Sequence, residues 1–138
     1  MRSIIVDTGA IVGWFDPGDS HHERAAEFFA SLRPNDRLLT TWPVVTEVSH
    51  LLDRNRAVFF DWLALSGVEV INFSLEDFAA MRRWMAGYRD REIDLADASL
   101  AWLAGHENTT FIASTDFNDF AAYRIARGKR FRNLIAAP

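Results

Sequence analysis

The chain has 138 residues, 49% of them hydrophobic, which is the size of one ordinary domain with a single core, so we expect one domain over residues 1–138. It contains no cysteine, which excludes disulfides and thiolate metal sites and suits the reducing cytoplasm. The net charge of −4 argues against a protein coated in positive charge, such as one that packs nucleic acid without specificity.

Apolar runs separated by turn residues predict alternating strands and helices. In chain order we expect a strand at 3–6, a turn at 7–10, a helix at 11–15, a turn at 16–19, a helix at 20–32, a strand at 37–41, helices at 44–53 and 55–66, a strand at 68–73, helices at 74–86 and 94–105, and strands at 109–114 and 131–135. Asp7 interrupts the apolar residues near the N-terminus, so we expect neither a signal peptide nor a membrane span.

Capping residues predict where several helices begin. Ser20 and Glu23 have the spacing of a capping box, and Ser74 is expected to cap the helix that follows it. Pro43 suits the first position of its helix. Asp94 is expected to cap the helix at 94–105, because its side-chain oxygen can accept from unpaired N–H groups in the first turn.

Strands separated by helices predict the fold class. We expect an α/β domain of three layers, α/β/α, with a mostly parallel central sheet and the strand at 131–135 at one edge. In such a sheet the binding crevice lies beyond the carboxyl ends of the strands. Residues that directly follow a strand are therefore candidates for a functional site.

Two acidic residues occupy such positions. Asp7 directly follows the first strand, and Asp116 directly follows the strand at 109–114, so parallel strands place both at the same edge. Asp119 lies one turn beyond Asp116. Each has a simple structural alternative, because Asp7 can cap a helix and Asp116 a turn.

Two more acidic residues lie on helices. Asp97 is three residues after Asp94 on the same face, which also carries small residues, so we expect it to be at least partly buried. Glu47 falls on the apolar stripe of its helix, which should pack against the sheet. Alone, Glu47 could simply pair with an arginine.

Together, these acids favour a bound cation. Several carboxylates in one crevice of low dielectric cannot all stay ionised without a positive charge. The chain lacks cysteine and its four histidines lack the spacing of a zinc site, so an all-oxygen site favours Mg²⁺ or Mn²⁺. Such a site can hold a phosphodiester oxygen and lower the pKa of a bound water, which then attacks phosphorus.

The order and spacing of short motifs add a family resemblance over nearly the whole chain. The motifs are Val6-Asp7-Thr8-Gly9, His21-His22-Glu23-Arg24-Ala25, Thr46-Glu47-Val48, Tyr88-Arg89-Asp90, Asp94-Leu95-Ala96-Asp97-Ala98, and Ser114-Thr115-Asp116 with Asp119-Phe120. With these motifs the chain resembles the PIN-domain ribonucleases, and specifically the VapC-type toxins of bacterial toxin–antitoxin pairs.

The resemblance implies roles for particular residues. It implies an acidic quartet around one or two Mg²⁺ or Mn²⁺ ions, two auxiliary acids, and two hydroxyls that orient ligands or water. The quartet is Asp7, Glu47, Asp97 and Asp116, the auxiliary acids are Asp94 and Asp119, and the hydroxyls belong to Thr8 and Ser114. The implied activity is metal-dependent cleavage of RNA, such as transfer or ribosomal RNA.

The resemblance also implies protein partners. A VapB-type antitoxin would insert a C-terminal segment into the cleft, and the chain would form a homodimer. Large apolar residues are available for a dimer surface or, alternatively, for the core: Trp14, Phe15, Phe28, Phe29, Trp42, Phe59, Phe60 and Trp62.

A basic cluster lies near the C-terminus, at Arg124, Arg127, Lys129, Arg130 and Arg132. One interpretation is a solvated, salt-bridged face. A second is that the cluster, and Arg124, Arg127, Lys129 and Arg130 in particular, follows the RNA backbone, since arginine suits phosphate. A third is that it serves the antitoxin.

Two other classes of function fit the sequence less well. A phosphohydrolase with an aspartyl nucleophile needs a second Asp two residues after the first, where this chain has Gly9, and a receiver domain needs a lysine after a later strand, whereas the only lysine is Lys129. A non-catalytic PIN-like module that binds RNA or antitoxin would be supported by loss of one of the four acids. None is missing.

Overall fold

The computed structural model describes residues 1–138 and has a central sheet of five parallel strands. The strands are β1 (Ser3–Val6), β2 (Arg37–Thr41), β3 (Glu69–Ile71), β4 (Phe111–Ala113) and β5 (Arg132–Asn133). Their order is β3-β2-β1-β4-β5, and every neighbouring pair is parallel. β1 is central, with Ile5 opposite Leu39 of β2 and Ile112 of β4.

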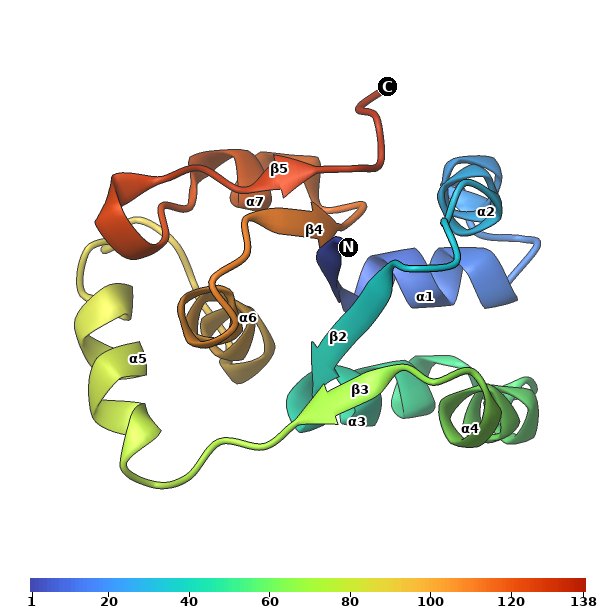
Figure 1. The fold of residues 1–138 in the computed structure, drawn as a ribbon, viewed down its shortest axis with the longest axis horizontal. Helices are drawn as coiled ribbons and strands as arrows, with labels where there is room; N and C mark the ends of the chain where they lie inside the picture. The colour runs from blue at the N-terminus through green and yellow to red at the C-terminus, as the bar shows by residue number, and fades with distance from the viewer.

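Seven α-helices connect the strands. They are α1 (Thr8–Phe15), α2 (His22–Ala30), α3 (Trp42–Leu51), α4 (Arg56–Leu65), α5 (Asp77–Met85), α6 (Leu95–His106) and α7 (Phe117–Ala122), with a 3-10 turn, η1, at Ala126–Gly128. Figure 1 shows α5 and α6 on one side of the sheet and α1, α2 and α4 on the other. The predicted three-layer α/β/α architecture with a parallel sheet is confirmed.

The topology changes direction at β1. The chain moves from β1 to β2 and β3 on one side, and then crosses to β4 and β5 on the other. The carboxyl ends of β1 and β4 therefore flank the position where a parallel sheet forms its binding crevice. Both Asp7 and Ser114 directly follow these strands.

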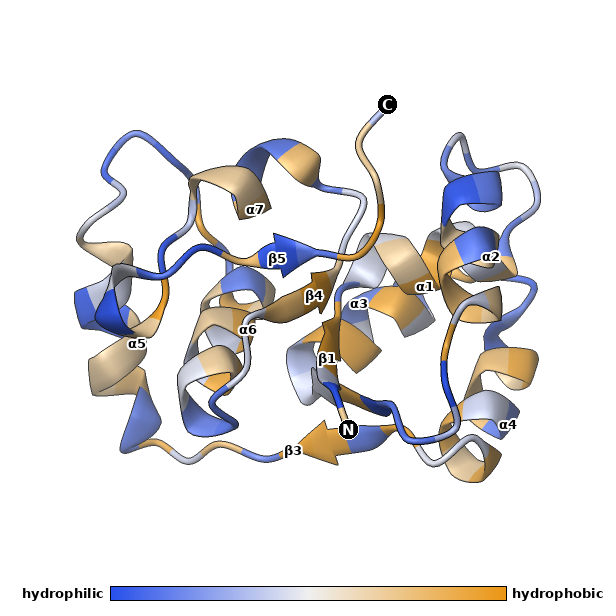
Figure 2. Cartoon of the chain, turned by 45° about the horizontal axis from the view of Figure 1, so that its top comes forward, coloured by the Kyte–Doolittle hydropathy of each residue, from blue (hydrophilic) through white to orange (hydrophobic).

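The core is built on the central strands. Ile4, Ile5 and Val6 of β1 are fully buried, as is Ile112 of β4. Figure 2 shows the apolar central strands between helices with mixed surfaces, while β5 is hydrophilic. This agrees with the predicted position of β5 at the edge of the sheet, where Arg132 is exposed.

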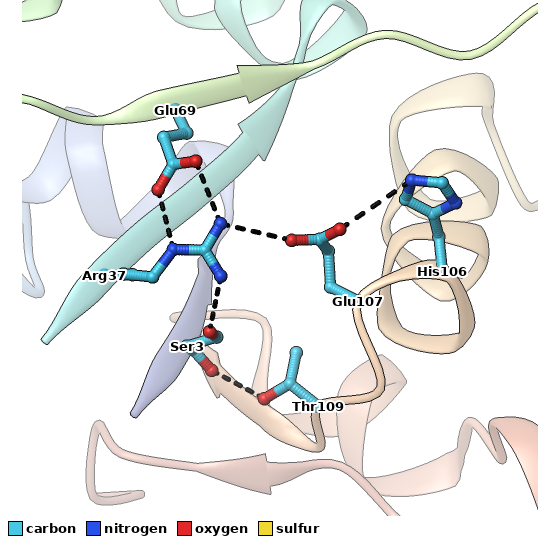
Figure 3. Close-up of polar contacts among 6 residues, drawn as sticks. All are labelled: Ser3, Arg37, Glu69, His106, Glu107 and Thr109. Carbon is cyan, nitrogen blue, oxygen red and sulfur yellow. Dashed lines mark hydrogen bonds and ion pairs between the residues drawn. The ribbon is translucent and has the colours of Figure 1, made fainter. Parts of the chain in front are cut away.

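An ion-pair network joins the strands at their amino ends (Figure 3). Arg37 donates from Nε and Nη2 to the two carboxylate oxygens of Glu69, at 2.8 and 2.9 Å, and from Nη1 to the hydroxyl of Ser3. It also contacts Glu107 at 3.3 Å. The hydrogen bond from Arg37 lowers the pKa of Glu69. Arg37, Glu69 and Glu107 are thus paired within the fold.

Some helix boundaries differ from the predictions. Residues 8–10, predicted as a turn, form the start of α1, because Asp7 accepts a hydrogen bond from the N–H of Thr8 and caps the helix. The capping box at Ser20 is wrong, since α2 begins at His22 and Asp19 accepts from the N–H of His21.

The cap predicted at Ser74 is also wrong, because α5 begins at Asp77, whose side chain accepts from the N–H of Ser74. The short helix α7 was not predicted. None of the helices combines the length and apolar character needed to cross a bilayer.

Candidate active site

Asp7 links the carboxyl ends of the two central strands. Its side chain is almost fully buried, with the residue only 5% exposed. Oδ1 accepts from the N–H of Thr8 at 2.8 Å, and Oδ2 accepts from the hydroxyl of Ser114, which follows β4, also at 2.8 Å. Burial, followed by the negative charge of Asp97, raises the pKa of Asp7 to about 7, and Glu47 adds to this effect. The two hydrogen bonds oppose the shift.

Ser114 is held in place by the neighbouring edge strand, β5. Its hydroxyl accepts from the N–H of Asp116 at 3.0 Å while it donates to Asp7. The side-chain amide of Asn133, in β5, accepts from the N–H of Ser114 and donates to its carbonyl oxygen, at 3.1 and 2.9 Å. The edge strand therefore supports the residue that joins Asp7 to the loop after β4.

Asp97 lies in the first turn of α6. The predicted cap is confirmed, because Asp94 Oδ1 accepts from the N–H of Asp97 at 2.9 Å. Tyr123 donates its hydroxyl to Asp97 Oδ2 at 2.7 Å. Burial is the main cause that raises the pKa of Asp97 to about 6; the hydrogen bond from Tyr123 opposes this shift, and the charges of Asp94, Asp116 and Asp119 contribute to it.

Three carboxylates meet in one cluster. Asp97, Asp116 and Asp119 each offer one oxygen, and these three oxygens lie within 4.8 Å of one another. Asp116 caps α7 by accepting from the N–H of Asp119, and burial is the main cause of its raised pKa. Asp119 also forms an ion pair with Arg91, which comes from the loop before α6.

The structure therefore brings the predicted acids into one neighbourhood, in two parts. Asp97 and Asp116 share the three-acid cluster with Asp119, which was expected only as an auxiliary acid. Asp7 and Glu47 lie outside that cluster, but the charges of Asp97 and Glu47 both act on Asp7. Glu47, on α3, is partly buried.

The oxygen-rich site suits a hard divalent cation. The charged groups that could coordinate a metal are all carboxylates, the ligands that Mg²⁺ and Mn²⁺ prefer. Burial raises the pKa of Asp7 and Asp97, which means that their negative charges are unfavourable in the protein alone. A bound cation would stabilise both carboxylates in their ionised form. Beside them, Thr8 has the only buried side-chain polar atom in the protein without a hydrogen-bond partner, its Oγ1.

The backbone packs closely at this point. A Cβ atom added to Gly9, in the first turn of α1, would lie 2.1 Å from Oγ1 of Thr115, in the loop after β4. Glycine therefore lets α1 approach the loop that carries Ser114 and Asp116.

Three site residues were not predicted from the sequence. Tyr123 orients Asp97, Arg91 pairs with Asp119, and Asn133 holds Ser114. Tyr123 lies four residues after Asp119, on the chain segment that leaves α7, and this spacing was the only available signal for it.

The predicted basic residues lie in the segment between α7 and β5. Arg124 is partly buried, whereas Arg127, Lys129 and Arg130 are exposed. None of the four forms an ion pair within the protein.

Comparisons with known proteins agree with this geometry. Residues 4–126 match the PIN domain family model. The chain is 30% identical over 134 residues to ribonuclease VapC26 of Mycobacterium tuberculosis, and the match covers 93% of this chain and 97% of that protein.

Two solved structures share the fold. VapC20 from Mycobacterium tuberculosis, a toxin that cleaves the sarcin–ricin loop, has a TM-score of 0.74 at 22% identity, with 87% of this chain and 95% of that chain covered. FitAcB from Neisseria gonorrhoeae has a TM-score of 0.53 at 20% identity, with 85% and 90% covered. With the family match over most of its length, the chain belongs to the PIN-domain family and is a VapC-type member of it.

Proposed function

We propose that this chain is a metal-dependent endoribonuclease, a VapC-type toxin that hydrolyses phosphodiester bonds of cellular RNA such as transfer or ribosomal RNA. In this proposal residues 1–138 form a single nuclease domain, and the protein acts in the cytoplasm. The observation that carries it is the meeting of Asp97, Asp116 and Asp119 next to the buried Asp7, at the carboxyl edge of a PIN-domain sheet. The name of the relative, ribonuclease VapC26, supports the same activity.

The proposed cofactor is Mg²⁺ or Mn²⁺. Asp97, Asp116 and Asp119 would hold it, with Asp7 and Glu47 completing the negative surroundings. A bound divalent ion of this kind lowers the pKa of a coordinated water and stabilises charge on a phosphodiester oxygen.

The protein's own groups keep the carboxylates in place. Ser114 and the N–H of Thr8 each bind one oxygen of Asp7, so its carboxylate cannot rotate freely. Tyr123 binds one oxygen of Asp97 and leaves the other available. Arg91 holds Asp119 and places a positive charge beside the site, where it can attract a phosphate.

The proposed partners are a VapB-type antitoxin and a second copy of the chain. An arginine of the antitoxin would neutralise the acids that otherwise attract a cation. Of the large apolar residues, Phe28, Phe29 and Phe59 belong to the core, whereas Trp42 and Phe60 are half exposed and lie beside the same hollow between α3 and α4. This exposed surface supports the dimer.

Incubation of the purified protein with total cellular RNA tests the activity. New 5′ ends should appear with Mg²⁺ or Mn²⁺, and should be absent with chelator and with the Asp97→Asn protein. Mapping these ends identifies the RNA and the bond. Intact RNA in the presence of either metal, with a protein that is folded by circular dichroism, would rule the proposal out.

A further inference from the structure

The basic residues lie on a short hairpin over residues 124–130. Arg124 and Arg130 pair as an antiparallel bridge, and the N–H of Ile125 donates to the carbonyl oxygen of Lys129 at 2.8 Å. The turn contains two left-handed residues, Arg127 with φ of 62° and Gly128 with φ of 70°. Ile125 is buried and anchors the hairpin to the domain. The hairpin therefore has a defined shape.

Two of the five basic side chains of this region already have partners. Arg124 donates from Nη1 to the carbonyl oxygens of residues 121, 122 and 123, at 3.3, 3.0 and 3.2 Å, and so caps the end of α7. The guanidinium of Arg132 lies 5.5 Å from the centre of the Phe111 ring. Arg127, Lys129 and Arg130 are exposed and pair with no carboxylate.

A polar hollow lies next to these free cations. Its volume is about 510 Å³, and both Arg127 and Lys129 line it. Asn108, Thr109 and Thr110, between the end of α6 and the start of β4, line its other side. Two cations beside hydroxyl and amide groups match the way proteins bind nucleic-acid phosphates.

The hollow lies at the opposite end of α6 from the acidic cluster. Asp97 lies in the first turn of α6, and Ala104 and Gly105 near the other end of this helix line the hollow together with Ile125 of the hairpin. The twelve residues of α6 correspond to about 18 Å at 1.5 Å per residue. A stacked strand with a phosphate every 3.4 Å covers that length with about five nucleotides.

We infer that the hollow beside the hairpin binds a backbone phosphate of the RNA substrate, several nucleotides away from the bond that is cut. The inference rests on the proposed ribonuclease function. It makes the substrate an RNA long enough to reach both ends of α6, and it assigns the remote contact to Arg127 and Lys129. Arg127 and Lys129 form no ion pair within the protein, so both are available to a polyanion.

Neutralising the two cations tests the inference. Binding is measured by fluorescence anisotropy in the Asp97→Asn protein, so that the RNA stays intact. Arg127→Gln with Lys129→Gln should weaken binding of a stem-loop RNA about tenfold and reduce the slope of log affinity against log salt by about 1. Binding of a trinucleotide, which is too short to reach the hollow, should not change.

A matched control removes the same charge elsewhere. Arg33→Gln with Arg54→Gln also neutralises two exposed arginines without an ion pair, and should leave both affinities and the salt slope unchanged. Equal melting temperatures establish that both double variants are folded.

Two outcomes overturn the inference alone, and a third overturns the proposed function. The hairpin variant can match the control while the native protein still cleaves RNA, which removes the remote contact and leaves the nuclease. It can lose affinity for a polyglutamate peptide but not for RNA, which assigns the hairpin to a protein partner. If the native protein cleaves no RNA, the proposed function itself fails.

Discussion

Tyr123 donates its hydroxyl to Oδ2 of Asp97 at 2.7 Å from a fully buried position. The chain around Tyr123 is itself held by two aromatic residues. Trp84 donates from Nε1 to the carbonyl oxygen of Arg124 at 2.7 Å, and the hydroxyl of Tyr88 accepts from the N–H of Arg124 at 2.6 Å. Residues of α5 and of the loop after it therefore orient a carboxylate of the acidic cluster through one phenol.

Replacing Tyr123 with Phe should weaken metal binding while keeping the ring packed. The variant frees the Asp97 carboxylate to rotate, and loss of such a supporting hydrogen bond costs at least about tenfold in metal affinity. Calorimetric titration with Mn²⁺ measures this directly. Unfolding in chelator separates any general loss of stability, and unchanged Mn²⁺ affinity would show that Tyr123 has no positioning role.

Replacing Asp97 with Asn should abolish cleavage and leave the fold intact. The activity should fall by more than about 100-fold, which is the upper end of the effect of residues that only support a ligand. Without metal the variant should melt at a higher temperature than the native protein near neutral pH, because the Asp97 pKa of about 6 means that the native fold holds an unfavourable charge there. Full activity of this variant would remove Asp97 from the catalytic centre.

The metal-free protein should lose stability as the pH rises from about 4 to about 7. The pKa of Asp7 is raised from 3.8 to about 7, so between these values the folded protein binds a proton that the unfolded chain does not. The stabilisation is complete below the unfolded pKa and disappears as the pH passes the folded one. For Asp7 alone it is about 4 kcal/mol.

Urea unfolding in chelator across this pH range measures the effect. Asp7→Asn should reduce the slope and leave the part that comes from Asp97, whose pKa is raised to about 6, and Mn²⁺ should restore stability at the high end. Asp36, whose pKa is lowered to about 2 by its hydrogen bond with Arg2, acts only at lower pH and in the opposite direction. A stability that increases through this range would contradict the assignment.

Replacing Ser114 with Ala should destabilise the protein by about 1 to 3 kcal/mol, since it leaves Asp7 Oδ2 and the N–H of Asp116 without a partner. It should also raise the pKa of Asp7 further, because the hydroxyl stabilises the charged form. Denaturant unfolding and the pH profile of Mn²⁺ binding measure the two effects. As a comparison, Arg37→Met at the amino ends of the strands should lower stability without altering Mn²⁺ binding.

Much of the fold was predictable because its signals are local. Apolar runs separated by helices predicted the parallel sheet, and the same rule placed Asp7 and Asp116 at one edge. Capping was predicted correctly at Asp94 and wrongly at Ser20 and Ser74. In both of the latter cases a nearby aspartate accepts the backbone hydrogen bond instead.

The supporting residues of the site were not predictable in this way. Tyr123 and Asp97 are 26 positions apart, and Arg91 and Asp119 are 28 apart. No period of a helix or strand connects such pairs, so only the packed fold reveals them. The family resemblance, in contrast, depends on the order of motifs along the chain and is confirmed by the match over residues 4–126.

The position of β4 has a consequence for biosynthesis. This strand lies between β1 and β5, although more than a hundred residues precede it in the chain, and Asp116 follows it. A nascent polypeptide that ends before Asp116 has no complete acidic cluster. During translation the acidic cluster therefore cannot assemble until elongation has also passed Asp119.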